Sequence, residues 1–410
     1  MTSPLRAQPA RPGWQLCPYE ADRHAAQHRE VIAAIFSCEL EEADRWVGVA
    51  GAEKIRVLEQ DGEYAATAVL MPMAQFHGGR SVRTRGVAGV GVRPEYRRDG
   101  VGSLLMAEIL REVEAQGEAL SILYASTTKF YRGLGYEIAG THYAARLETS
   151  YLPPVRTELE IRALTEDDRP AMQEIVRANG RVMPGHMDRC DYLWPRLLRP
   201  RGKPAQAFGV FDDAGKLRGF LAFTLASSEA LDDFQAMELR VFEAADAEGL
   251  RGLMALLRSH HSMVREISTT LPPQSPFWSW LPEQRARMKM REQFLIRLVR
   301  VGDALAQRGY PVGVSGELLL EVEDPVLPDN HGLWHLRVRD GRGSAVRVAD
   351  PDQASEDRVR LDAGALAALY SGHQSAENLA ILDRAQGSPE ALARASGLFV
   401  GRAPTCPEMF

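Results

Sequence analysis

The stretch "VRPEYRRDGVGSLL", residues 92–105, places a proline, three arginines and two glycines between an apolar run and an amphipathic segment. The run before it, "GVAGVGV" at 86–92, predicts a buried strand, and apolar residues recur at helical spacing after it. A turn that opens a helix directs unpaired backbone N–H groups and the positive end of the helix dipole toward one point, which favours an anion such as a phosphate group. By itself, the spacing is equally compatible with an ordinary turn that carries exposed arginines.

The length and composition of the chain describe an ordinary globular protein of several domains. With 410 residues, about two or three domains are expected at roughly 150 residues each. The chain is 45% hydrophobic and 25% charged, which argues against extensive disorder. Its formal net charge of -6 argues against a general binder of nucleic acid or of anionic membranes, and suits a cationic small molecule better.

The cysteines and histidines predict neither a disulfide framework nor a metal site. Four cysteines are scattered without the close spacing of zinc ligands, which favours a reducing, cytoplasmic compartment. His24 and His28 lie four residues apart, but no third ligand is near in sequence, so we expect them on the surface of a helix. Neither a signal peptide nor a membrane span is expected, because no apolar stretch approaches 18 residues.

The order of elements in the first part of the chain can be read from its periodicity. The first ~16 residues look like a loose tail, and apolar spacing predicts a helix over 21–36. Residues 54–76 predict a hairpin around "EQDGE", since Asp-Gly supplies the positive φ angles of a tight turn. The strand at 86–92, the helix from 101 to 113 and a strand at 119–126 complete the unit.

A similar order of elements starts again after the proline pair in "TSYLPPVRTELEIR", residues 149–162. Thr165 is the expected cap of a helix, residues 208–225 form a candidate hairpin, and 236–260 repeat strand, turn and helix. We interpret this as a degenerate copy of the first unit. It has "EAADAEGL" where the first has "RPEYRRDGVG", so only the first unit is expected to bind the ligand of that turn.

A third segment begins after the prolines of "TLPPQSPFWSWLPEQ", residues 270–284. Periodicity predicts a helix within 294–311, strands at 316–324 and 332–341, and helices at 361–372 and 388–399. This pattern is typical of an α+β domain.

Two motifs of the first unit resemble those of the GCN5-related N-acetyltransferase (GNAT) superfamily. The first is "V-x-P-x-x-R-x-x-G-x-G", carried here by Val92, Pro94, Arg97, Gly100 and Gly102. The second is "x-F-Y-x-x-x-G-Y", with the matching residues Phe130, Tyr131, Gly133, Gly135 and Tyr136. In that superfamily the first turn holds the pyrophosphate of acetyl-CoA, so the resemblance implies acetyl-CoA as co-substrate.

The whole chain, from about residue 20 to 410, resembles the enhanced intracellular survival (Eis) family of these enzymes. The resemblance implies tandem acetyltransferase folds, the second one degenerate, followed by a sterol-carrier-protein-like domain, with expected boundaries at 1–152, 153–290 and 291–410. It also implies a homohexamer that acetylates amines of aminoglycosides at several positions.

The resemblance also implies a general acid and a general base for acetyl transfer. Tyr131 matches the family's acid tyrosine, and a phenol with a pKa near 10 can keep its proton at neutral pH until it gives it to the thiolate of CoA. Tyr136 is the competing tyrosine, although a packed ring suits it better. The family's base is the terminal α-carboxylate, here that of Phe410, and the prolines and apolar end of "PTCPEMF" favour a docked tail over a frayed one.

Further residues match the family's contacts with the co-substrate. The backbone of Val90, Gly91 and Val92 is expected to pair with the pantetheine amides, and Ser126 and Thr127 match the remaining contacts. The expected N–H donors to the pyrophosphate are Arg98, Asp99, Gly100, Val101, Gly102 and Ser103. No metal is expected in the reaction.

Three acidic residues after the first predicted helix are candidates for contacts with the acceptor. Glu39, Glu41 and Glu42 could form an acidic cleft for a polycation or simply a solvated face. An acidic residue commonly precedes the final phenylalanine in the family, whereas this chain has Met409 there, with Glu408 one place earlier. The alternatives are a protein lysine or polyamine acceptor, or, in a different class, a lipid or apolar-ligand binding protein with a vestigial acetyltransferase unit.

Overall fold

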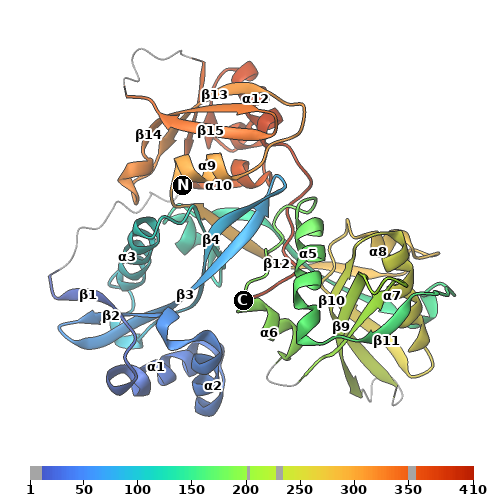
Figure 1. The fold of residues 1–410 in the computed structure, drawn as a ribbon. Coiled ribbons are helices and arrows are strands. Elements are labelled where there is room, and N and C mark those ends of the chain that lie inside the picture. Colours follow the sequence, from blue (N-terminus) through green and yellow to red (C-terminus); the bar gives the residue numbers. More distant parts are fainter. Residues whose placement is uncertain (1–11, 201–203, 228–233, 350–356) are drawn as a thin grey trace. The chain divides into compact units, whose positions relative to one another are not determined.

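The structure is a computed structural model that describes residues 12–200, 204–227, 234–349 and 357–410. The chain divides into two compact units (Figure 1). One contains residues up to 140, residues 294–403 and Phe410; the other contains residues 141–293 and 404–409. The architecture is mixed α+β, as the sequence predicts, and the segments that the expected first and third domains occupy belong mainly to the same unit.

The first unit opens with an N-terminal sheet whose strands run in the order β1-β2-β3-β4-β5-β12. These strands are β1 (Trp14–Pro18), β2 (Ile55–Gln60), β3 (Glu63–His77), β4 (Arg80–Val92), β5 (Leu120–Tyr124) and the C-terminal half of β12 (Arg287–Leu298). The predicted hairpin turn is confirmed, because Asp61 and Gly62 both have positive φ, at 49° and 87°. The expected loose tail is wrong from Trp14 onward, since that segment pairs with β2; residues 1–11 lie outside the described residues.

Helices cover both faces of this sheet. They are α1 (Ala21–Phe36), α2 (Leu40–Ala50), α3 (Val101–Ala115) and α4 (Thr128–Arg132). Gly91 of β4 packs against Ile35 of α1, whereas Val92 reaches Gly102 of α3. Successive residues of a strand point to opposite faces, so α1 and α3 lie on opposite sides of the sheet.

A five-stranded sheet in the order β15-β14-β13-β16-β17 forms the C-terminal part of the same unit. Its strands are β13 (Gly316–Glu323), β14 (Gly332–Arg339), β15 (Arg342–Arg347), β16 (Arg358–Asp362) and β17 (Ala385–Gln386). Its helices are α9 (Val301–Gln307), α10 (Ala363–Ser371), α11 (Ala376–Ile381) and α12 (Pro389–Phe399). The expected helix within 294–311 is only partly right, because residues 294–298 pair with β5 as a strand.

The second unit repeats the strand arrangement, in the order β6-β11-β10-β9-β8-β7. The strands are β6 (Glu137–Glu148), β7 (Glu160–Ala163), β8 (Gln206–Phe211), β9 (Leu217–Ser227), β10 (Gln235–Ala244) and β11 (Val264–Thr269). The helices are α5 (Arg169–Gly180), α6 (Leu193–Leu198), α7 (Ala247–Ser259) and α8 (Pro276–Ser279). Thr165 caps the start of this unit's first helical segment as predicted, and its N–H donates to Asp168 at 2.8 Å.

Across the described residues, no helix is both long enough and apolar enough to span a bilayer. None of the four cysteines, which all lie in the described part of the chain, forms a disulfide bond.

Candidate active site

Strands β4 and β5 pair over only a short distance and leave an open edge. Their parallel pairing covers Thr84–Gly86 and Leu120–Ile122, yet β4 continues to Val92. The part of β4 beyond Gly86 still pairs with β3 but contains a bulge. The bulge is marked by a shift of register against β3 and by a positive φ of 57° at Gly89. Within the described ranges, the backbone groups of Val90–Val92 on the β5 side therefore have no strand partner. This edge is where the sequence predicts contacts with the pantetheine amides.

The turn after β4 opens helix α3 without a side-chain cap. Gly100 is the N-cap residue, in the left-handed conformation with φ 75°, and the first turn carries no acidic residue. The first helical bond that reaches back to the turn runs from the Leu104 N–H to the Gly100 carbonyl, so the N–H groups of residues 101–103 have no acceptor within the helix. Arg97 donates from Nε to the carbonyl of Val92 at 3.0 Å, which ties the turn to the strand.

Gly102 lies in the first turn of α3, among the backbone N–H groups that have no acceptor within the helix. A Cβ atom there would be 3.5 Å from the Phe130 ring, an ordinary contact, so the protein's own packing does not require glycine. Gly91 differs, since a Cβ atom would come within 2.2 Å of Ile35. A bare helix start, with no carboxylate in its first turn and an uncrowded glycine, suits the doubly charged pyrophosphate of acetyl-CoA.

Two tyrosines of the second motif are buried, and they differ in their hydrogen bonds. Tyr131 on α4 is 6% exposed, and burial raises its pKa to about 12. No hydrogen bond of its hydroxyl to another described residue is found. The hydroxyl of Tyr136 lies 2.7 Å from Ser121 Oγ in a fully buried position, and burial raises its pKa as well. Tyr131 is therefore the tyrosine with a free phenol, and Tyr136 is the packed one.

The ring of Phe410 lies at the point where β4 and β5 part. It is 5.5 Å from the ring of Tyr124, between centroids, and one of its ring carbons would be 3.2 Å from a Cβ atom on Gly86. Tyr124 ends β5, and Gly86 is the last residue of β4 that pairs with it. The final residue is thus docked within the first unit rather than frayed.

The six residues before Phe410 are fixed in the second unit by buried polar contacts. Arg189 donates to Glu408 and to Glu243, both at 2.7 Å, and its side chain is 4% exposed. A ring nitrogen of His142 lies 2.8 Å from the carbonyl oxygen of Cys406. The carboxylate of Glu408 therefore forms a buried ion pair with Arg189.

The other expected site residues lie at the surface. Ser126 and Thr127 are exposed after β5, and Arg98 and Asp99 are exposed in the turn. Glu39, Glu41 and Glu42 are exposed around the start of α2.

The prediction that His24 and His28 lie on a helix surface is wrong. They are 2% and 0% exposed, because that side of α1 faces the sheet. His24 Nε2 is 2.8 Å from Glu59, and His28 Nδ1 is 3.0 Å from the Tyr64 hydroxyl. Burial lowers the pKa of His28 to about 4.

Cys17, His24 and Glu59 together form a group that could hold a metal ion. However, His24 Nδ1 accepts the Glu20 N–H at 2.9 Å, and the Arg23 guanidinium donates to the same Glu59 oxygen as His24 at 2.6 Å. Both ring nitrogens are satisfied and a fixed positive charge stands beside the carboxylate. The cluster is explained by these hydrogen bonds alone.

Comparisons with known proteins agree with this architecture. Residues 21–139 and residues 185–301 each match a model described as an acetyltransferase (GNAT) domain, and residues 301–407 match a sterol carrier protein domain. A crystal structure of a GCN5-related N-acetyltransferase from Anabaena variabilis superimposes with a TM-score of 0.89 at 26% identity, and covers 97% of this chain and 100% of that one.

Two relatives span most of the chain. An uncharacterized N-acetyltransferase of Streptomyces avermitilis is 28% identical over 94% of this chain and 93% of that protein. The N-acetyltransferase Eis of Mycobacterium tuberculosis is 28% identical over 76% of each chain.

The chain is thus a GNAT N-acetyltransferase, with two GNAT domains followed by a sterol carrier protein domain. Within that class it is Eis-like. Enzymes of this class use acetyl-CoA and an amine. The three domain boundaries stay a prediction.

The sequence patterns did not reveal the buried contacts around the C-terminal tail or those behind the tyrosine motif. Arg189, Glu243 and His142 fix the tail, and Arg297 and Asp324 lie behind the tyrosine motif. None belongs to a motif. The one available signal is Arg297, a charged residue in the middle of the apolar run "FLIRLV".

Proposed function

We propose that the enzyme transfers the acetyl group of acetyl-CoA directly to an amine of a cationic small molecule, with aminoglycosides as its principal acceptors. The observation that carries the proposal is the uncapped first turn of α3 beside the open edge of β4, which together suit the pyrophosphate and the pantetheine arm. The contacts assigned to this ligand are the backbone of residues 90–92 and 98–103, with Ser126 and Thr127.

In this reaction the neutral amine attacks the thioester carbonyl, a C–N bond forms and the C–S bond breaks. Tyr131 gives its proton to the departing thiolate. A pKa of about 12 keeps the phenol protonated at neutral pH, and its free hydroxyl has no protein partner to compete with the sulfur among the described residues. Tyr136 is the weaker candidate for this role, because its hydroxyl lies in a fully buried position 2.7 Å from Ser121 Oγ.

The α-carboxylate of Phe410 accepts the proton that the amine loses, either directly or through a water molecule. A terminal carboxylate has a reference pKa of about 3.5, so it is a weak base in water. The docked ring of Phe410 supports the assignment, because it holds the end of the chain at the β4–β5 opening.

An aminoglycoside acceptor is supported by the similarity to Eis and by the net charge of -6, which favours cations. The competing acceptors are a protein lysine and a polyamine. We further propose a homohexamer, on the basis of the Eis-like domain order, and sedimentation velocity would measure it.

The test is consumption of acetyl-CoA with kanamycin or neomycin, in parallel with a lysine peptide and a polyamine. Aminoglycosides should give the highest kcat/KM. Deletion of Phe410 should lower kcat by about 10-fold or more, because a general base typically contributes ~100-fold and water can replace part of it.

Preferred turnover of the peptide would overturn the choice of acceptor, and full activity without Phe410 would overturn the assignment of the base. A Phe410→Leu variant is the matched control. It keeps the terminal carboxylate and changes only the ring, so it should retain much more activity than the deletion.

A further inference from the structure

The loop that follows Tyr131 is folded back onto the backbone of that tyrosine. The carbonyl oxygen of Tyr131 accepts two hydrogen bonds, from the Leu134 N–H at 3.0 Å and from the Tyr136 N–H at 3.2 Å. Gly135 between them has a φ of 81°, which only glycine adopts readily. The position of the Tyr131 backbone therefore depends on where residues 134–136 are held.

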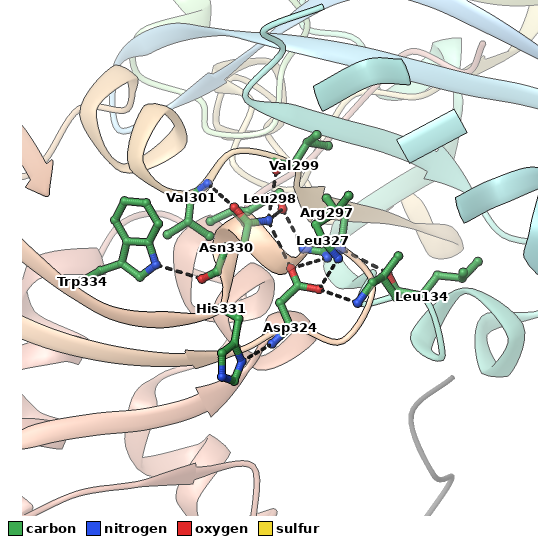
Figure 2. A network of polar contacts seen from close by, with 11 residues as sticks. Leu134, Arg297, Leu298, Val299, Val301, Asp324, Leu327, Asn330, His331 and Trp334 are labelled. Atoms are coloured by element: carbon green, nitrogen blue, oxygen red, sulfur yellow. Dashed lines mark hydrogen bonds and ion pairs between the residues drawn. The ribbon is translucent and has the colours of Figure 1, made fainter. Parts of the chain in front are cut away.

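Arg297 of β12 holds this loop from behind. Its Nε donates to the carbonyl of Leu134 at 3.0 Å and its Nη1 to the carbonyl of Leu298 at 2.6 Å, while its Nη2 pairs with Asp324 (Figure 2). The guanidinium lies directly against Gly135, where a Cβ atom would be only 2.6 Å from Arg297 Nε. Glycine is thus required at position 135 for both its φ angle and this contact.

Asp324 and Asn330, which follow strand β13, fix the arginine in turn. One Asp324 oxygen accepts the N–H groups of Val326 and Leu327 at 3.1 and 3.0 Å, and the other accepts the Asn330 side-chain amide at 3.1 Å. Asn330 also accepts the Val301 N–H at 2.9 Å (Figure 2). Both members of the ion pair are 0% exposed, and each has several hydrogen bonds.

A contribution to stability alone does not explain why this ion pair is buried. A buried ion pair at best roughly balances the loss of hydration of its charges, and apolar residues of similar volume often serve stability equally well. A guanidinium with several fixed partners instead specifies geometry, since its planar donors point in set directions. The geometry it specifies here is that of the Leu134 carbonyl, and the N–H of the same residue donates to the carbonyl of Tyr131, so Arg297 is two hydrogen bonds away from the Tyr131 backbone.

We propose that Arg297 is a positioning residue for the acid Tyr131, and that Asp324 of the sterol-carrier-like domain keeps Arg297 in place. The C-terminal domain then serves acetyl transfer by fixing the loop that carries the acid. The inference rests on the proposed role of Tyr131. A general acid must lie within hydrogen-bond reach of the leaving sulfur, and a displacement of about 1 Å can cost up to ~100-fold in rate.

A second contact of the same kind supports the proposal. Glu137, at the end of the loop, is 3% exposed and receives Arg132 Nη2 at 2.7 Å on one oxygen and Arg384 on the other. Arg384 lies just before β17 and also pairs with Asp362 at 2.8 Å. Both ends of the loop are therefore tied to the C-terminal part of the unit.

The test is a double-mutant cycle between Arg297→Lys and Tyr131→Phe. Lysine keeps the positive charge beside Asp324 but has only one ammonium group, so it cannot also hold the Leu134 carbonyl through an Nε donor. In the wild-type background, Arg297→Lys should lower kcat about 10-fold while KM for acetyl-CoA changes less than about 2-fold. In the Tyr131→Phe background it should have almost no further effect, because no acid remains to be positioned.

Arg300→Lys is the matched control, because it changes an exposed ion pair with Asp303 three residues further along the chain. Its activity should equal that of the wild type in both backgrounds. If Arg297→Lys does not fold, Asp324→Asn tests the same contact, because it removes the carboxylate that pairs with Arg297. It keeps an oxygen that can accept the N–H groups of Val326 and Leu327. Circular dichroism and thermal unfolding of each variant identify those that have lost the fold.

An equal loss of kcat in both backgrounds would show a merely structural role and overturn the inference. Full activity of Tyr131→Phe alone would overturn the proposed acid, and the positioning role with it. These two failures are distinguished by the Tyr131→Phe measurement.

Discussion

The two GNAT domains begin the corresponding helix, α3 or α7, in opposite ways. Helix α3 starts at Gly100 without a side-chain cap, whereas α7 starts at Asp246, whose carboxylate accepts the Gly249 N–H at 2.9 Å. Arg218 pairs with that carboxylate at 2.7 Å, and a Cβ atom on Gly249 would lie 1.8 Å from the Arg218 carbonyl oxygen. The turn before α7 therefore has a carboxylate that accepts a hydrogen bond from its N–H groups, and its backbone is in close contact with Arg218. The start of α3 has no side-chain cap, so its N–H groups could bind a ligand.

The helices that follow the next strand, α4 after β5 and α8 after β11, also differ between the two domains. In the first domain, α4 carries Phe130 and Tyr131, and in the second, α8 carries Phe277 and Trp278. Trp278 donates its indole N–H to the Pro272 carbonyl at 2.8 Å, so its polar group already has a partner within the protein. A repeat can therefore keep the fold while its helix start and the segment after the next strand both differ.

The largest expected effect is that of Tyr131→Phe, which removes the proposed proton donor and little volume. We expect kcat to fall about 100-fold or more, because general acid catalysis typically contributes ~10²–10⁴-fold. Steady-state kinetics with acetyl-CoA and kanamycin would measure it. Trp278→Phe at the corresponding place of the second domain should leave kcat unchanged, and a similar loss in both variants would contradict the comparison.

Gly102→Asp would make the first turn resemble the second. A carboxylate at this position opposes the pyrophosphate, so KM for acetyl-CoA should rise about 10-fold or more, equivalent to ~1.4 kcal/mol of binding. The thermal stability should hold or increase slightly, because an acidic side chain in the first turn is favourable for the helix dipole. An unchanged KM would mean that the co-substrate does not bind at this turn, and Gly102→Asn serves as the uncharged control.

Asp246→Ala removes the cap of α7. The loss of the bond to Gly249 and of the pairing with Arg218 should lower the free energy of unfolding by about 1 kcal/mol. Denaturant titration would measure this change, and kcat should equal that of the wild type. If activity fell together with stability, the second turn would have a role in the reaction that its geometry does not indicate.

The smallest expected effect is on the alkaline side of the pH profile. Burial raises the pKa of Tyr131 to about 12, so the phenol stays protonated below that pH. An ordinary tyrosine, with a pKa of about 10, would lose about half of its acid form by pH ~10. We therefore expect kcat of the wild type to show no fall between about pH 8 and pH 10, measured as released thiol after subtraction of the enzyme-free rate. A twofold decline centred near pH ~10 would contradict a buried acid.

Sequence patterns predicted the elements of the first domain well, because turn residues and periodicity are local. The hairpin at Asp61 and Gly62 and the helix over 21–36 are confirmed. The run "FLIRLVR" was predicted as helix, but its first five residues are a strand, because closely spaced apolar residues suit a buried strand as well as a helix. Pairing with β5, which is distant in sequence, decided between the two.

Burial of polar residues could not be read from the sequence. His24 and His28 look like surface residues of an amphipathic helix until Glu59 and Tyr64, more than 30 positions away, supply their partners. Arg297 and Asp324 are isolated charges in the sequence and a fully buried ion pair in the fold. Such pairs depend on contacts between distant segments, which spacing does not encode.

The sequence by itself determined the α+β class and the glycine turn that opens α3, because periodicity and turn residues depend on neighbours within a few turns of the chain. The choice of Tyr131 as the acid to test came from the resemblance of its motif to that of the GNAT superfamily. Only the tertiary structure decided that the phenol of Tyr131 has no hydrogen-bond partner among the described residues, while that of Tyr136 is bound to Ser121. It also decided that the ring of Phe410 docks beside Gly86 and Tyr124. The physical reason is that hydrogen-bond partners and ring contacts are settled by which distant segments pack together.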